Sequence, residues 1–193
     1  QPAADAHHRQ YPKLASKFHV IWNGFDPAEA FTPRTGGPQL LKDIIHVGTL
    51  YGPRNPAPLL ASFQRLRRAG KLKGDPRITL AGPIEQAPLD SAKQSGGEQE
   101  GWLVVENRSL PRKEADAYND RADAHLIVDT HGGKDAVQVP AKIFTSIRSG
   151  VPIVALTPPG SPTSGILEKS GLDHCLLDPH MPPAEMDARL EAF

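Results

Sequence analysis

The fold is decided by the stretch Val139-Pro-Ala-Lys-Ile-Phe-Thr-Ser-Ile-Arg-Ser-Gly-Val-Pro-Ile-Val-Ala-Leu156. It predicts a loop, a helix, a helix end and a buried strand in direct succession. Pro140 stands where the first helical residue is expected, and Gly150 and Pro152 follow the last turn, so both helix ends are marked. The helix start points toward the polar loop 129–138, which follows an apolar run. In an α/β sheet such a junction is where ligands bind.

The start of this helix is a candidate anion site. Ile143, Phe144 and Ile147 share one face at helical spacing and should face the sheet, whereas Lys142 and Thr145 lie on a polar face. Free amides, the positive end of the helix dipole and the Lys142 ammonium would all favour a phosphate. The alternative is an ordinary helix with Lys142 in solvent, and the stretch alone leaves both open.

Composition indicates a globular chain without a polyanion-binding character. The 193 residues are 38% hydrophobic and 23% charged, and the formal net charge is zero, which disfavours nucleic acid as a partner. The single Cys175 excludes an internal disulfide framework and suits a reducing compartment, where we expect it to be a buried apolar residue. No apolar segment approaches the ~20 residues of a membrane span. Because the first residue is Gln, we expect a soluble mature product or fragment.

Strand-like and helix-like patterns alternate along the chain, which predicts a parallel sheet covered by helices. The expected class is α/β, a Rossmann-like three-layer domain with a mostly parallel six-stranded sheet. The expected strands are Ile44–Gly48, Arg77–Gly82, Trp102–Glu106, Ala124–Val128, Pro152–Leu156 and His174–Leu177. The expected helices follow Asn55, Pro111, Pro140, Ser161 and Pro182. For the polar connection 83–101 a short helix and a mobile loop both stay open.

Three regions follow from these patterns. Residues 1–43 are expected to be an amino-terminal tail and interdomain connector, in which 1–17 lack periodicity and 18–22 form a short strand. Residues 44–181 form the Rossmann-like domain. Residues 182–193 form a carboxyl-terminal helix that we expect to continue in a longer protein, with Met186 and Leu190 four residues apart.

Two more loops are predicted to reach the same carboxyl edge of the sheet. The loop 48–56 supplies glycines and the guanidinium of Arg54, but it lacks both the G-x-G-x-x-G and the G-x-x-x-x-G-K-[ST] nucleotide motifs. The alternative for this loop is a plain turn with a surface arginine. The loop 106–109 leaves the third strand beside it.

Metal and nucleophile chemistry are disfavoured by the sequence. His7 and His8 are adjacent on a polar tail, and Asp129 with His131 lacks a third ligand, so we expect no metal site. No G-x-S-x-G elbow is present, and Ser161 before a proline is better explained as a helix cap.

Several short motifs occur in an order that resembles a known family. They are Val20-Ile-Trp-Asn-Gly-Phe-Asp26, Val47-Gly-Thr-Leu-Tyr51 with Arg54-Asn55, Leu80-Ala-Gly82, Ala122-Asp-Ala-His-Leu126, and Val139-Pro-Ala-Lys142 with Gly150-Val-Pro152. Together they resemble the carboxyl-terminal, donor-binding half of group-1 (family 4) glycosyltransferases of the GT-B fold, over nearly the whole chain.

The resemblance implies a nucleoside diphosphate sugar as the bound small molecule, with no cofactor and no metal. The diphosphate would contact Gly48, Thr49, Arg54 and Lys142. The sugar and ribose would contact Asp129, Gly132, Gly133, Val137, Gln138, Val139 and Thr145. The nucleobase would lie against Asn107, Arg108, Ser109 and Leu110. The implied reaction is glycosyl transfer with the diphosphate as leaving group, its charge stabilised by the helix dipole and cations.

The chain also departs from the family pattern. The usual E-x7-E carboxylates would fall at Val137 and Thr145, and Thr49 and Leu50 replace a second basic residue, so Lys142 would have to substitute for it. The amino-terminal acceptor domain is missing, which makes it the expected partner in cis. We therefore expect the isolated chain to bind donor weakly and to transfer nothing.

The resemblance implies a cytoplasmic enzyme, and a parent acting on a lipid or polysaccharide would dock peripherally at the inner membrane face. Two other functions stay open. A sugar-nucleotide epimerase would need Asp129 or Asp135 near the sugar, and a degenerate non-catalytic nucleotide-binding or scaffold module would explain the missing Glu pair. The base, the sugar and the acceptor are not defined by the sequence, and stereochemical retention is favoured only by the family resemblance.

Overall fold

The computed structural model describes residues 2–25, 40–129 and 138–193, and its centre is a six-stranded sheet. The strand order is β3-β2-β1-β4-β5-β6, and every neighbouring pair is parallel. The expected α/β, Rossmann-like fold is confirmed, and the sheet is wholly parallel rather than mostly so. The strands are β1 (Asp43–Val47), β2 (Arg77–Ala81), β3 (Leu103–Glu106), β4 (Ala124–Val128), β5 (Ile153–Leu156) and β6 (His174–Leu177).

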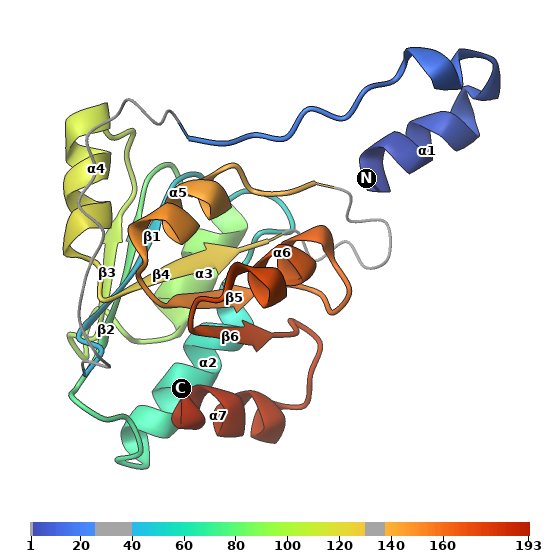
Figure 1. The fold of residues 1–193 in the computed structure, drawn as a ribbon. Coiled ribbons are helices and arrows are strands. Elements are labelled where there is room, and N and C mark those ends of the chain that lie inside the picture. Colours follow the sequence, from blue (N-terminus) through green and yellow to red (C-terminus); the bar gives the residue numbers. More distant parts are fainter. Residues whose placement is uncertain (1, 26–39, 130–137) are drawn as a thin grey trace.

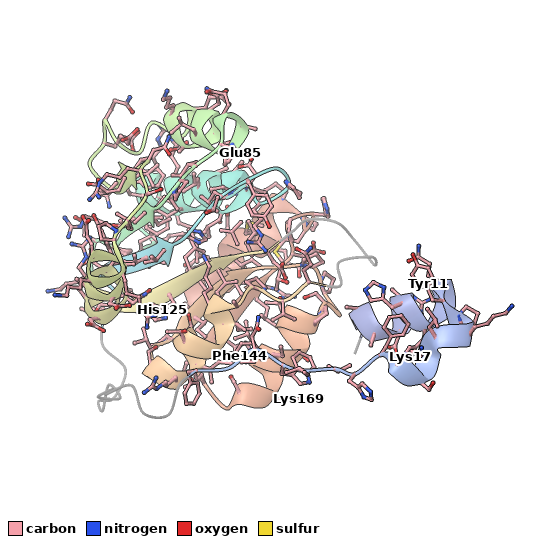
Figure 2. All side chains as sticks on the ribbon, turned by 90° about the horizontal axis from the view of Figure 1, so that it is seen from above. Tyr11, Lys17, Glu85, His125, Phe144 and Lys169 are labelled. Carbon is pink, nitrogen blue, oxygen red and sulfur yellow. The ribbon has the colours of Figure 1, made fainter. Side chains whose placement is uncertain are left out.

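Helices cover both faces of the sheet (Figures 1 and 2). Figure 2 shows Glu85, just before α3, on one side of the sheet, and Phe144 of α5 and Lys169 of α6 on the other. The helices of the domain are α2 (Ala57–Arg68), α3 (Gln86–Gln94), α4 (Arg112–Arg121), α5 (Lys142–Ser149), α6 (Pro162–Ser170) and α7 (Pro183–Ala192).

Each face of the sheet has its own apolar core, because successive strand side chains point to opposite faces. On one face Leu126 and Val128 pack in a cluster with residues of α2, α3 and α7. On the other face Ile127 packs with Ile143 of α5 and Leu167 of α6. All five residues of β4 are buried, as expected of a central parallel strand.

The carboxyl-terminal helix α7 packs against α2. Met186 and Leu190 are buried, so the expected apolar face is confirmed. The Asp187 carboxylate accepts hydrogen bonds from Ser62 (2.5 Å) and from Arg65 (2.7 Å) on α2. Cys175 of β6 is also buried, and burial raises the pKa of its thiol to about 11.

Two expectations about element positions were wrong, and one open assignment is resolved. Helix α5 begins at Lys142, two residues after Pro140, because Ile143 and Phe144 first form tight turns back to residues 140 and 141. The segment 18–22 is not a strand: Ile21 is 90% exposed, and the sheet ends at β3 and β6 without pairing to it. The connection 83–101, for which a short helix was one of two open possibilities, contains α3.

The amino-terminal tail has more regular structure than its sequence predicts. It forms α1 (Pro2–Gln10) and the 3₁₀ helix η1 (Pro12–Lys17), which lie apart from the sheet domain (Figure 1). The rings of His7 and Phe18 stack with centroids 5.5 Å apart, which ties the end of η1 back to α1. The contact joins residues eleven positions apart, which a search for helical periodicity does not find.

The loops after β1 and β2 approach each other so closely that a side chain does not fit between them. A Cβ on Gly82 would lie 2.5 Å from the carbonyl oxygen of Gly48, and the φ angle of Gly82 is +135°. Backbone at this φ is essentially restricted to glycine. The two loops are also joined by the N–H of Leu50, which donates to Pro83 at 3.0 Å.

We expect Gly82→Ala to lower the free energy of unfolding by about 2–4 kcal/mol, because the methyl group adds a backbone clash to an unfavourable φ. Gly101→Ala is the control, since Gly101 has a φ of +77° and a Cβ placed there would meet nothing within 4 Å. It should lose only about 1 kcal/mol. Urea unfolding measures both, and equal losses would show that the close approach is unimportant.

Candidate anion-binding site

The strand order reverses direction between β1 and β4, and this switch point positions the candidate site. β1 pairs with β2 over five residue pairs, from Asp43–Arg77 to Val47–Ala81. It pairs with β4 over only two, Ile44–Ala124 and Ile45–His125. The ladder therefore stops before the carboxyl ends of these two strands. Open α/β sheets bind their ligands at such a point.

His46 of β1 bridges the place where this ladder stops. Its side chain is 1% exposed, and its Nδ1 lies 3.0 Å from the carbonyl oxygen of Leu126 on β4. The Nζ atom of Lys142 lies 3.0 Å from Nε2 and 3.3 Å from Nδ1 of the same ring. A single imidazole thus connects β1, β4 and the first residue of α5.

The Lys142 amine lies directly over the first glycine of the loop after β1. A Cβ on Gly48 would be 3.1 Å from Lys142 Nζ. The guanidinium of Arg54, from the same loop, is 4.8 Å from the Tyr51 ring centroid. Its Nε atom is buried and has no hydrogen-bond partner among the described residues. The sequence-predicted phosphate residues Gly48, Arg54 and Lys142 are therefore brought together, whereas Thr49 is exposed.

The basic groups of this cluster lie close enough to lower one another's pKa values, as the pKa shifts of Lys142 and His46 indicate. Burial and the nearby charge of Arg54 lower the pKa of the Lys142 ammonium to about 7. Burial, Lys142 and Arg54 hold the pKa of His46 well below its usual value. Within residues 2–25, 40–129 and 138–193, neither cation forms an ion pair with a carboxylate. Among the described residues, the two neighbouring basic groups therefore have no carboxylate partner.

The start of α5 contributes less than expected. The N–H of Ile143 donates to Pro140 at 3.0 Å and that of Phe144 to Ala141 at 3.4 Å, so two amides of the first turn are already used. The amides of Ile143 and Phe144 are therefore not free, and phosphate binding at this turn stays a prediction. The helix dipole remains, but the side-chain cations dominate the local charge.

Asp129, at the end of β4, is completely buried in a hydrogen-bond network with the loop after β5. Its carboxylate accepts from Thr157 Oγ1 at 3.1 Å, and Thr157 Oγ1 lies 2.8 Å from Ser161 Oγ. Ser161 in turn caps α6 by accepting from the N–H of Ser164, which confirms its expected capping role. The network holds the ends of β4 and β5 together.

The residues expected to contact a nucleobase follow β3. Asn107 accepts a hydrogen bond from the N–H of Ile84 at 2.8 Å, which joins this loop to the one after β2. Arg108 is ion-paired with Glu114 and Glu106, and Ser109 is exposed. Leu110 is half-buried. The side chains of Asn107 and Arg108 thus already have partners in the protein.

The residues expected to contact the sugar are described only in part. Gln138 and Thr145 are exposed, and Val139 packs against the core beneath α5 and α6. Gly132, Gly133 and Val137 lie outside the described residues, as do His131 and Asp135, so the predictions for them stay predictions.

Sequence reasoning missed His46, the residue at the centre of the cluster. The available signal was a histidine inside the apolar run Ile44–Val47, in a strand expected to be buried. Buried strand positions favour apolar residues, so a histidine there needs a hydrogen-bond partner. Its partner Leu126 is eighty residues away and could not be paired with it from spacing.

Two features are absent from the part of the chain that the structure describes. Within it, no group of three or more His, Cys, Asp or Glu side chains is arranged to hold a metal ion. None of its helices is long and apolar enough to cross a membrane.

Comparison with known proteins shows a likeness of structure without one of sequence. No protein family and no curated protein matches the chain. The structure is similar to trehalose-6-phosphate from E. coli bound with UDP-2-fluoro glucose (TM-score 0.57, 16% identity, 79% of this chain and 36% of that one). It is similar to AviGT4, a glycosyltransferase involved in Avilamycin A biosynthesis (TM-score 0.51, 18% identity, 89% of this chain and 48% of that one). It is also similar to TarM (TM-score 0.55, 12% identity, 95% of this chain and 34% of that one).

These neighbours are glycosyltransferases of the GT-B fold, so the resemblance seen in the motifs is confirmed for the fold. The chain has the architecture of a Rossmann-like domain of that fold. It spans between 34% and 48% of the length of these three proteins.

The lowered pKa of Lys142 predicts a pH-dependent stability. Unfolding returns the amine to a pKa of about 10.4, so the unfolded chain binds more protons between pH 7 and 10.4 and stability rises with pH there. Below pH 7 the folded protein therefore carries the free-energy cost of a buried ammonium, and Lys142→Met removes that cost. We expect the variant to be more stable than wild type below pH 7, with the advantage shrinking as the pH rises toward 10.4.

Urea unfolding of both proteins at pH 6, 7.5 and 9 measures this difference. Lys169→Met is the control, because Lys169 is an exposed residue in the last turn of α6. Its effect should not vary with pH. A constant difference between Lys142→Met and wild type at the three pH values would contradict the prediction.

Proposed function

We propose that this chain is the donor-binding half of a GT-B glycosyltransferase and binds a nucleoside diphosphate sugar at the carboxyl edge of its sheet. The observation that carries the proposal is the meeting of Lys142 and Arg54 beside Gly48 without a described carboxylate to neutralise them. A diphosphate supplies two negative charges of the required sign at that point.

The identity of the ligand is supported by two further points. The fold is that of GT-B glycosyltransferases, and one of the structural neighbours is bound with UDP-2-fluoro glucose. The loops after β1, β2 and β3 are connected through Gly48, Gly82 and Asn107, so a ligand at Lys142 would have a continuous rim on which to extend. An elongated sugar nucleotide suits this arrangement better than a free phosphate does.

The proposed reaction is transfer of the glycosyl group to an acceptor. The bond between the anomeric carbon and the diphosphate oxygen breaks, and negative charge develops on the leaving diphosphate. Lys142 and Arg54 lie where they can stabilise that charge, so the chain's own cations take the role that a metal ion has in other transferases. The acceptor and its proton acceptor belong, in this proposal, to an amino-terminal half acting in cis.

The same proposal assigns the domain organisation. Residues 44–181 are the sugar-nucleotide domain, 182–193 the helix that closes it, and 1–43 the tail and connector to the other half. The chain alone then binds donor without transferring it, in a cytoplasmic enzyme.

Two alternatives remain distinguishable. An epimerase would need Asp129 or Asp135 at the sugar. The Asp129 carboxylate is buried against Thr157, which argues against that role for Asp129, and Asp135 lies outside the described residues. A non-catalytic binding module is favoured by Val137 and Thr145, which stand where the related transferases carry the Glu pair. An epimerase would interconvert a free sugar nucleotide without any acceptor, which neither other function does.

Titration calorimetry with UDP-glucose, GDP-glucose and ADP-glucose tests the donor site. We expect one of them to bind wild type, and Lys142→Met and Arg54→Met each to weaken that binding by about tenfold or more, because each removes one charge from the diphosphate. The loss should diminish at high salt.

Lys169→Met is again the matched control, since topology puts the end of α6 at the opposite edge of the sheet. It should bind as wild type does. Binding of none of the three nucleotides would reject the donor site and favour the non-catalytic module, and so would equal losses in all three lysine and arginine variants.

A further inference from the structure

Diphosphate binding by two cations does not require a buried histidine, yet His46 occupies the central strand of the sheet with 1% of its surface exposed. Its neighbours in β1, Ile44 and Ile45, are buried and apolar, as a two-sided parallel strand favours. An imidazole there gives up apolar packing and must be satisfied by hydrogen bonds. The contacts that satisfy it therefore indicate its role.

The geometry defines the form of the ring. The Leu126 carbonyl oxygen can only accept, so Nδ1, at 3.0 Å, carries the hydrogen and donates to it. The Lys142 Nζ atom lies 3.0 Å from Nε2 and 3.3 Å from Nδ1, so it packs over the face of the ring and not in line with the Nε2 lone pair. His46 is thus a neutral imidazole whose face contacts the lysine amine.

Two basic groups near the ring favour this neutral form. Lys142 faces it from α5 and Arg54 from the loop after β1, and both are cationic. The carboxylate at the end of β4, Asp129, is hydrogen-bonded to Thr157. A second positive charge on His46 would repel Lys142 from its position.

We propose that His46 is a positioning residue, which as a neutral imidazole anchored on Leu126 holds the Lys142 amine over Gly48 for the diphosphate. The inference rests on the proposed function. A lysine that swings freely in solvent must be immobilised whenever it binds an anion, whereas one held by His46 has lost that freedom already on folding. The buried ring thereby supports anion affinity without touching the ligand.

The first test needs no ligand. Lysine labelled with ¹³C at Cε gives a Lys142 signal that is assigned by its absence in Lys142→Met, and its pH titration is followed by NMR. We expect a midpoint near pH 7 in wild type and a shift toward about 10.4 in His46→Leu, because the released amine moves into solvent. His46→Gln, which keeps a donor for Leu126 and a planar polar group beneath Lys142, should titrate closer to wild type than His46→Leu does. An unchanged or lower midpoint in His46→Leu would overturn the proposal.

The second test is a double-mutant cycle with whichever of UDP-, GDP- or ADP-glucose binds wild type. His46→Leu should weaken binding by about tenfold in the wild-type background and by less than about twofold in Lys142→Met, because a positioning residue acts only through the residue it positions. Equal losses in both backgrounds would indicate a purely structural role and reject the proposal. Urea unfolding of each variant checks that it is folded.

The two tests separate this inference from the function on which it rests. If wild type binds and Lys142→Met binds weakly, but His46→Leu binds as wild type does, only the role of His46 fails. If no nucleotide binds while the titration midpoint of Lys142 still shifts in His46→Leu, the contact between His46 and Lys142 is supported. The donor site is then rejected, and so is diphosphate binding as the purpose of that contact.

Discussion

The incomplete pairing of β1 with β4 is the constraint on which the site depends. β1 is paired along its whole length with β2 but over only two residues with β4, so the two strands part before their carboxyl ends. The chain leaves β1 toward β2 and leaves β4 toward β5, so the loops after β1 and β4 run in opposite directions. His46 fills this opening, and its bond to Leu126 replaces part of the missing ladder with a side-chain contact. The same opening admits the Lys142 amine from α5.

Stability and binding oppose each other at this place. An uncompensated pair of cations in a partly buried setting lowers the stability of the empty protein, which is the usual reason that such groups are neutralised. Here Lys142 and Arg54 share the loop region beside Gly48, and the described residues provide no carboxylate to match them. A protein retains such an arrangement when a ligand of opposite charge offsets the penalty.

Local patterns predicted the sheet well because each strand is a short apolar run with a turn signal beside it, as in Ala124–Val128 and His174–Leu177, whose bounds match the structure. The meeting of Gly48, Arg54 and Lys142 also followed, since parallel strands bring their carboxyl ends to one edge. The features that the sequence did not predict depend on contacts that residue spacing does not encode. They are the hydrogen bond between His46 and Leu126, the stacking of Phe18 on His7 of α1, and the two tight turns that precede α5. An exposed apolar segment such as 18–22 has the pattern of a strand but no strand to pair with.

The buried thiol in β6 makes this chain convenient for spectroscopy. Cys175 is the sole cysteine of the sequence, and with a pKa near 11 it stays protonated and shielded from reagents at neutral pH. A cysteine introduced at an exposed position of the loop after β1, such as Thr49, would then be the one reactive group toward a maleimide dye. Fluorescence from that single label would report how the loop's surroundings change, with no need to remove the native sulfur first.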